Sequence, residues 1–195
     1  EKSHEGNFTN EGGYEYRFRY LKNIMGLWMI QSVRNEMNKA YSFAQLCEMA
    51  EEVKDFPSRV DVDEIRFFAP DSMIRTIQEA CRESGQPVPE TPGELATVVY
   101  QSLADCYQRS ISQLEAMTGK TYPAINIIGG GANADYLNQL TANSTGKTVY
   151  AGPTEATAIG NIACQMLACG DFSSVSEARA CIFDSFAVKT FVPAP

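Results

Sequence analysis

Histidine is almost absent from the sequence, since the 195 residues contain only His4. A Ser-His-Asp triad, a Cys-His pair, a histidine-rich zinc site and a histidine general base would all have to use this one residue. His4 lies in a polar stretch over residues 1–7, whose composition is typical of a frayed terminus, so we expect it to have no functional role. Histidine-dependent catalysis is therefore disfavoured.

Paired cysteine motifs are also lacking. No Cys-x-x-Cys occurs among the six cysteines, which are Cys47, Cys81, Cys106, Cys164, Cys169 and Cys181. Such scattered spacing is typical of buried thiols in a cytosolic protein rather than of a metal cluster or a disulfide framework. On a helix Cys164 and Cys169 would point about 140° apart, so a bridge between them requires the helix to have ended.

Long apolar runs and an excess of basic residues are missing too. The sequence has no run of about 18 apolar residues and no signal-peptide pattern, so we expect no membrane segment. Lysine and arginine number 16 against 24 aspartates and glutamates, and the net charge of −8 argues against nucleic acid as a partner. With 44% hydrophobic and 21% charged residues, the composition predicts a folded globular domain. The chain opens with Glu1 rather than Met, which we interpret as the mark of a fragment.

What the sequence does contain is a series of helix signals. Periodic apolar residues and capping patterns predict helices over residues 20–37, 42–53, 71–84, 92–117 and 154–168, and one more from the capping pattern of Ser174 and Glu177. Short strands are expected at residues 65–68, 124–128, 147–151 and 188–192. In the first helix Asn23 and Gln31 are eight residues apart and would share one face, where a solvated polar stripe is the simplest interpretation. We find no internal repeat and no linker, so residues 1–195 are expected to form one domain.

The most informative stretch is a predicted strand, 124–128, followed at once by Gly129, Gly130 and Gly131 and then by a helical pattern that reaches Thr145. With the strand at 147–151, this order predicts a right-handed unit of two parallel strands joined by a helix. A glycine turn between a strand and a helix lets backbone amides approach a phosphate, while a tight turn without ligand is the alternative.

Two nucleotide motifs are matched only loosely. Residues 129–134 fit the dinucleotide pattern GxGxxA, but the acidic residue expected at the end of the next strand is missing. Two Gly-Lys-Thr triplets, at 119–121 and 146–148, lack the first glycine of a P-loop and end helices instead of starting them. In the helix at 154–168, Ala156, Gly160 and Cys164 form a small-residue face that we expect to pack closely against a neighbouring element.

Four motifs in order carry a resemblance to a known family. They are Asn-Phe-Thr-Asn-Glu-Gly-Gly at residues 7–13, Leu-Lys-Asn-Ile-Met-Gly-Leu-Trp-Met-Ile-Gln at 21–31, Ile-Ile-Gly-Gly-Gly at 127–131 with Leu-Asn-Gln-Leu at 137–140, and Ala-Gly-Pro-Thr-Glu-Ala-Thr-Ala-Ile-Gly-Asn at 151–161. Together they resemble the C-terminal part of carbohydrate kinases of the FGGY family. The resemblance implies an α/β fold: a ribonuclease-H-like (actin-like ATPase) C-terminal lobe, helix-rich with a small, partly parallel sheet. It also implies a cytoplasmic enzyme that transfers the γ-phosphate of Mg-ATP to the 1-hydroxyl of L-rhamnulose.

The resemblance also implies roles for particular residues. Gly129, Gly130 and Gly131 match the turn that contacts the nucleotide phosphates, Gln31 matches a nucleotide-facing position, and Asn23 matches a substrate-facing one. Many members carry an asparagine that reaches the adenine where this sequence has Ala134, and the neighbouring Asn133 is the candidate to take its place.

One absence limits what this chain can do. The aspartate that serves as catalytic base in the family belongs to a His-Asp-Thr-like motif that does not occur here, and neither the N-terminal sugar-binding domain nor most Mg²⁺ ligands are expected in the chain. We therefore expect it to contribute contacts to ATP, to have no catalytic or metal-ligating residue of its own, and to be inactive alone. A nicotinamide-binding domain and a non-catalytic actin-like module are the alternatives.

Overall fold

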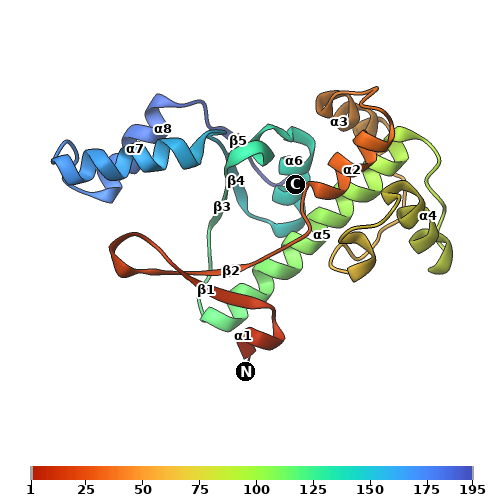
Figure 1. Ribbon diagram of the computed structural model, residues 1–195, viewed down its shortest axis with the longest axis horizontal. Coiled ribbons are helices and arrows are strands. Elements are labelled where there is room, and N and C mark those ends of the chain that lie inside the picture. Colours follow the sequence, from red (N-terminus) through yellow and green to blue (C-terminus); the bar gives the residue numbers. More distant parts are fainter. Residues whose placement is uncertain (1, 195) are drawn as a thin grey trace. The chain divides into compact units, whose positions relative to one another are not determined.

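The computed structural model describes residues 2–194, which separate into two units, the first ending at Tyr122 and the second beginning at Pro123 (Figure 1). The first unit contains α1 (Lys2–Glu5), β1 (Phe8–Gly12), the short 3₁₀ helix η1 (Tyr14–Tyr16), β2 (Phe18–Lys22), α2 (Trp28–Glu36), α3 (Phe43–Glu52), the 3₁₀ helix η2 (Ile65–Phe67), α4 (Met73–Glu83) and α5 (Pro92–Thr118). The second contains β3 (Ala124–Ile127), the 3₁₀ helix η3 (Gly129–Asn133), α6 (Asp135–Thr145), β4 (Thr148–Ala151), α7 (Ala156–Cys169), α8 (Val175–Ser185) and β5 (Lys189–Phe191). No helix among the described residues is long and apolar enough to cross a membrane.

Helix α5 forms the centre of the first unit, with α2, α3 and α4 gathered around its N-terminal half (Figure 1). It begins where the sequence predicts, at a capping box in which Thr91 accepts from the Glu94 amide and Glu94 accepts from the Thr91 amide, and it ends at Gly119 with φ of 65°. Gly93 packs directly on α3, since a Cβ placed there would lie 2.8 Å from the Met49 carbonyl oxygen. Thr97, which is fully buried, donates a hydrogen bond to the Ala50 carbonyl.

The predicted helix over residues 20–37 is wrong in its first half. Residues 18–22 form β2, which pairs antiparallel with β1, and only Trp28–Glu36 is helical. Aromatic and charged residues alternate from Tyr14 to Tyr20, which is the two-residue period of a strand. Gly26, with φ of 60°, then breaks the helical backbone pattern before α2. Asn23 precedes α2 and Gln31 lies on it, so the two do not share a helix face.

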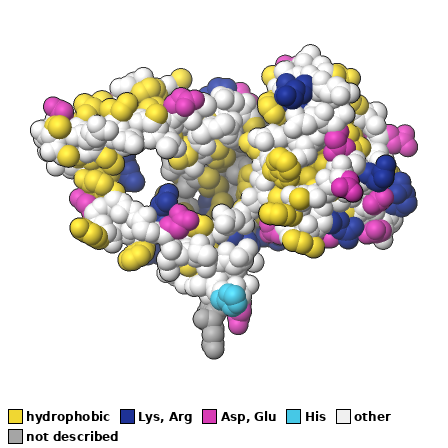
Figure 2. Space-filling view, viewed as in Figure 1, with side chains coloured by type: hydrophobic (Ala, Val, Ile, Leu, Met, Phe, Trp, Pro, Cys, Tyr) yellow, Lys and Arg dark blue, Asp and Glu magenta, His cyan; other side chains and the backbone are white. Residues whose placement is uncertain are grey.

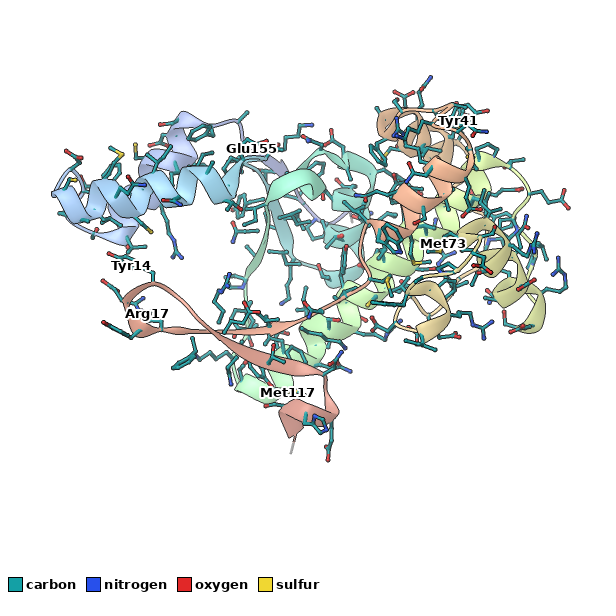
Figure 3. The ribbon with its side chains drawn as sticks, viewed as in Figure 1. Tyr14, Arg17, Tyr41, Met73, Met117 and Glu155 are labelled. Atoms are coloured by element: carbon teal, nitrogen blue, oxygen red, sulfur yellow. The ribbon has the colours of Figure 1, made fainter. Side chains whose placement is uncertain are left out.

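Within the hairpin of β1 and β2, Phe8 and Tyr20 stack with their ring centroids 4.9 Å apart. The Tyr20 hydroxyl links the hairpin to the rest of its unit, because it lies within hydrogen-bond distance of Ser3 Oγ, at 2.8 Å, and of Met117 Sδ, at 3.2 Å. Met117 of α5 is labelled in Figure 3. Ser3 belongs to α1, so residues 2–5 are helical where the sequence suggested a frayed terminus. His4 lies exposed in the same helix (Figure 2).

Two further expectations for the first unit need correction. Residues 65–67 form the 3₁₀ helix η2 instead of a strand, with Phe67 buried and Ile65 exposed. Helix α4 has Ser72 as its N-cap, one residue after the predicted start at residue 71, because the Ser72 hydroxyl accepts a hydrogen bond from the Arg75 amide. The same hydroxyl donates a hydrogen bond to the Glu36 carboxylate. The capping box of Ser42 and Gln45 at the start of α3 is confirmed.

The second unit confirms the predicted strand, glycine turn, helix and strand. β3 and β4 are parallel, with Ala124 opposite Thr148 and Ile127 opposite Ala151, and α6 connects them and ends at Gly146 with φ of 65°. The last strand, β5, pairs antiparallel with β4, which gives the sheet order β3-β4-β5. The chain is thus helix-rich with a small mixed sheet.

The small-residue face of α7 does not pack as expected. A Cβ placed on Gly160 would meet no other heavy atom within 4 Å, and Cys164 is exposed. The expectation of buried thiols also holds only in part, because Cys164, Cys169 and Cys181 are exposed, whereas Cys81 and Cys106 are buried. Among the described residues the cysteines form no disulfide, and Cys47 Sγ donates to the Tyr100 hydroxyl oxygen at 3.4 Å.

Candidate functional site

Two turns meet at the carboxyl ends of β3 and β4. The chain leaves β3 at Gly129, with φ of 74°, and leaves β4 at Gly152, with φ of 130°. The Gly152 amide donates to the Ile127 carbonyl at 2.8 Å, and the Gly129 amide donates to the Pro153 carbonyl at 3.2 Å. Because ligands of α/β proteins bind outside the carboxyl ends of parallel strands, this is the edge at which a site is expected.

The glycine turn presents backbone donors to this edge. Gly129–Asn133 forms η3, and the first amides of a 3₁₀ helix have no acceptor within the helix itself. The Gly129 amide is held by Pro153, and in a 3₁₀ helix the Gly131 amide bonds the carbonyl three residues earlier, which leaves the Gly130 amide for a ligand. Gly130 is exposed, and a Cβ placed there would meet nothing within 4 Å. This donor and this open space fit an anionic phosphate group.

Buried contacts with α6 hold the turn in place. Ala132 is 4% exposed, and its carbonyl accepts a hydrogen bond from Asn138 Nδ2 at 3.2 Å. Asn138 is 1% exposed, so this amide is part of the core beneath the turn. Sequence reasoning did not single out Asn138; the signal available was a polar residue on the apolar face of α6 that also carries Leu137.

The side chains at the mouth of the site are polar and exposed. Asn133 follows the glycines, and its Oδ1 accepts from the Thr154 hydroxyl at 3.5 Å, which links the two turns. Ala134 separates η3 from α6 and has no side-chain capping bond to offer. Lys189 of β5 lies beside the start of α6, with Nζ 2.8 and 2.7 Å from the two carboxylate oxygens of Asp135. Thr154 and Lys189 were not foreseen, because they reach the site through strand pairing and turn geometry.

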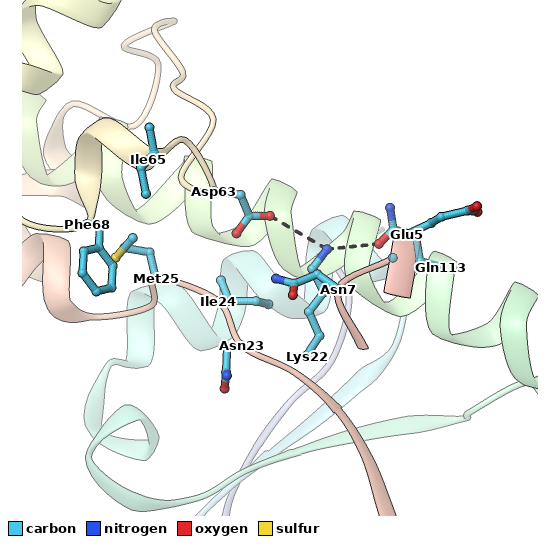
Figure 4. A pocket seen from close by; sticks show the side chains of 11 residues that line it. Glu5, Asn7, Lys22, Asn23, Ile24, Met25, Asp63, Ile65, Phe68 and Gln113 are labelled. Carbon is cyan, nitrogen blue, oxygen red and sulfur yellow. Dashed lines mark hydrogen bonds and ion pairs between the residues drawn. The ribbon is translucent and has the colours of Figure 1, made fainter. Parts of the chain in front are cut away.

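Asn23, the expected substrate residue, lies in the first unit on a different feature. It is one of the residues that line a cavity of about 510 Å³ between the hairpin, α5 and the segment around η2 (Figure 4). Within this cavity Lys22 Nζ lies 3.1 Å from Gln113 Oε1 and 3.9 Å from Asp63 Oδ2. The Lys22 side chain is only 14% exposed, so its charge is held against these two partners.

Gln31, the expected nucleotide residue outside the glycine turn, is exposed on α2. Its neighbours Met29, Ile30 and Val33 form the buried face of that helix, which leaves the Gln31 side chain on the solvent side. Within residues 2–194 no group of three or more histidine, cysteine, aspartate or glutamate side chains is placed to hold a metal ion.

Residues 1–169 match the model of the FGGY family of carbohydrate kinases, C-terminal domain. The chain belongs to this family. The rhamnulokinase of Halalkalibacterium halodurans is 51% identical over 99% of the chain and 41% of its own length, and that of Bacillus subtilis is 46% identical over 97% of the chain and 39% of its own length. The rhamnulokinase of Klebsiella pneumoniae is 41% identical over 98% of the chain. The chain therefore spans about two fifths of the length of these relatives.

Membership confirms the resemblance seen in the four sequence motifs and does not favour the nicotinamide-binding and non-catalytic alternatives. The glycine turn lies inside the region that matches the family model, whereas α8 and β5 lie beyond it.

Proposed function

We propose that this chain is the nucleotide-binding lobe of a sugar kinase that transfers the γ-phosphate of ATP to the 1-hydroxyl of L-rhamnulose. The observation that carries the proposal is the glycine turn at the carboxyl edge of β3 and β4, with the exposed Gly130 backbone open to a phosphate, inside a C-terminal domain of the FGGY family. The sugar is named from the rhamnulokinases, which resemble the chain over nearly its whole length.

In this proposal the residues of the chain bind and orient the nucleotide. The amide of Gly130 donates to a phosphate oxygen, Gly129 and Gly131 shape the turn around it, and Asn133 faces the base beside Ala134. In the first unit, Gln31 and Asn23 have the nucleotide-facing and substrate-facing roles that the family resemblance implies. Bound ATP, with Mg²⁺, supplies the phosphoryl group, and positioning plus charge stabilisation account for most catalysis of this kind.

The remaining parts of the enzyme lie outside the chain in this proposal. A sugar-binding domain would supply the catalytic aspartate and most of the Mg²⁺ coordination, so the chain alone has no turnover. The lobe has the ribonuclease-H-like, actin-like fold, and it works in the cytoplasm, where ATP is available.

Isothermal titration of the chain with ATP and, separately, with NAD tests the proposal. ATP should bind and NAD should not. Gly130→Ala should weaken ATP binding by about tenfold, because its methyl group would stand where the phosphate approaches the backbone. Gly12→Ala is the matched control, since a Cβ there also meets nothing within 4 Å but lies in β1 of the first unit. An equal loss of ATP affinity in both variants, or tighter binding of NAD than of ATP, would contradict the proposal.

A further inference from the structure

The segment after α8 is bound along one face of α6. Asp135, Gln139 and Asn143 are spaced four residues apart, so they form a polar stripe on that helix. Lys189 pairs with both carboxylate oxygens of Asp135, at 2.8 and 2.7 Å. Further along, Gln139 Nε2 donates to the Val192 carbonyl at 2.8 Å, and the Ala194 amide donates to Asn143 Oδ1 at 2.9 Å.

The same segment also contacts the second turn of the candidate site. Lys189 lies opposite Ala151 in the β4-β5 pairing, one residue before Gly152. A Cβ on Gly152 would lie 2.7 Å from the Ala187 carbonyl oxygen, so the backbone at residue 187 touches the turn directly. The segment from 187 to 194 thus contacts both the turn after β4 and the helix that follows the glycine turn.

Asp135 has a charge that conflicts with a phosphate site. As the first residue of α6 its carboxylate is favourable for the helix, but it places a negative charge four residues after Gly131, at the start of the helix that follows the glycine turn. An ammonium group within 3 Å of both carboxylate oxygens offsets that charge. Both side chains are more than half exposed, so the pair should add little to overall stability.

We propose that Lys189 is a positioning residue of the nucleotide site: it holds the first turn of α6 and neutralises Asp135, so that the glycine turn can accept an anionic phosphate. The inference rests on the proposed function. It assigns a role to a segment that lies beyond the matched family region of residues 1–169.

The positional part is tested without nucleotide, by hydrogen exchange of the chain. Lys189→Ala should speed exchange of the amides in the first turns of α6, near Asn138 and Gln139, by about two- to fivefold. This is the range expected from the loss of an exposed ion pair. Lys189→Arg should keep the exchange rates of the unaltered chain, because it keeps the charge. Unchanged exchange in Lys189→Ala would overturn the positional role, whether or not the chain binds ATP.

The electrostatic part is tested with ATP by a double-variant cycle. Lys189→Ala should weaken ATP binding by about fivefold at low salt and less at high salt, because the unpaired Asp135 carboxylate then repels the phosphates. Adding Asp135→Asn should restore the affinity. An affinity that stays low in the double variant would overturn the neutralising role. Failure of the unaltered chain to bind ATP would instead contradict the proposed function, and hydrogen exchange would still decide whether Lys189 positions α6.

Discussion

Gly152 and Ala187 are in backbone contact at the candidate site, with room for a hydrogen but not for a methyl group between them. A Cβ on Gly152 would lie 2.7 Å from the Ala187 oxygen, and φ of 130° is a conformation that L residues rarely adopt. We therefore expect Gly152→Ala to lower the free energy of unfolding by about 2–4 kcal/mol, from backbone strain and overpacking together. Urea unfolding measures the change. Gly130→Ala is the control, because a Cβ there would meet nothing within 4 Å. A similar loss of unfolding free energy in both variants would contradict the assigned contact.

The opposite result is expected at Gly160 in α7. A Cβ placed on Gly160 would meet no other heavy atom within 4 Å. The residue lies within a helix, and glycine has a low helix propensity. Gly160→Ala should therefore raise the free energy of unfolding by about 0.5–1 kcal/mol. The comparison variant is Gly93→Ala in α5, which should destabilise because its Cβ would be 2.8 Å from the Met49 carbonyl oxygen. Destabilisation by Gly160→Ala would show that the small-residue face of α7 is packed in solution.

The capping box of α5 should give the chain an acid-sensitive part of its stability. Hydrogen bonds from the backbone amides of Thr91 and Glu90 to the Glu94 carboxylate hold the pKa of Glu94 below its usual value. A group whose pKa is lower in the folded state stabilises the fold above its unfolded pKa, and the contribution is lost as the pH falls through the folded pKa.

The unfolding free energies of the unaltered chain and Glu94→Gln should therefore differ most near neutral pH and converge in acid, with the convergence at or below pH of about 4. Chemical unfolding from pH 7 down to pH 3 provides the measurement. Glu90→Gln is the control, since the backbone amide of Glu90, not its carboxylate, enters the cap. A difference that does not change with pH would contradict the assigned bonds.

The cysteines should divide into two classes by reactivity. Burial raises the pKa of Cys81. Two causes raise the pKa of Cys106 to about 11: burial, which is the larger, and the negative charge of the nearby Asp63 carboxylate. The thiolate is the reactive form, so both should resist alkylation at pH 8 until the chain unfolds. Cys164, Cys169 and Cys181 are exposed and should react first. Mass spectrometry after timed labelling identifies the order, and early modification of Cys106 would show that its surroundings are open.

Local signals predicted most of the fold. Helices α3 and α5 begin at the capping boxes that the sequence indicates, and α5 and α6 end at glycines, because a cap is satisfied within a few residues and needs no distant partner. The error at residues 20–37 has a different origin. Apolar residues at 24–30 suggested a helical face, whereas residues 18–22 before them pair with β1, and Tyr20 stacks on Phe8. These partners are distant from the helix signal and appear only in the tertiary structure.

The sequence predicted the candidate site only where the site residues are neighbours along the chain. The order of strand, glycines and helix placed Gly129–Gly131 correctly at the end of β3, since adjacent residues stay adjacent in space. Gly152 and Lys189 join the same edge only through the pairing of β3 with β4 and of β4 with β5. Asn138 stayed unnoticed because its role depends on a carbonyl six residues earlier that the turn directs inward.

The binding of ATP to the glycine turn is the central claim, and hydrogen exchange of the chain with and without ATP tests it most directly. Saturating ATP should slow exchange at the amides of Gly130 and Gly131 and leave α4, in the first unit, unchanged. The protection should disappear in Gly130→Ala and persist in Gly12→Ala. ATP-dependent protection that leaves the glycine turn unaffected would contradict the account.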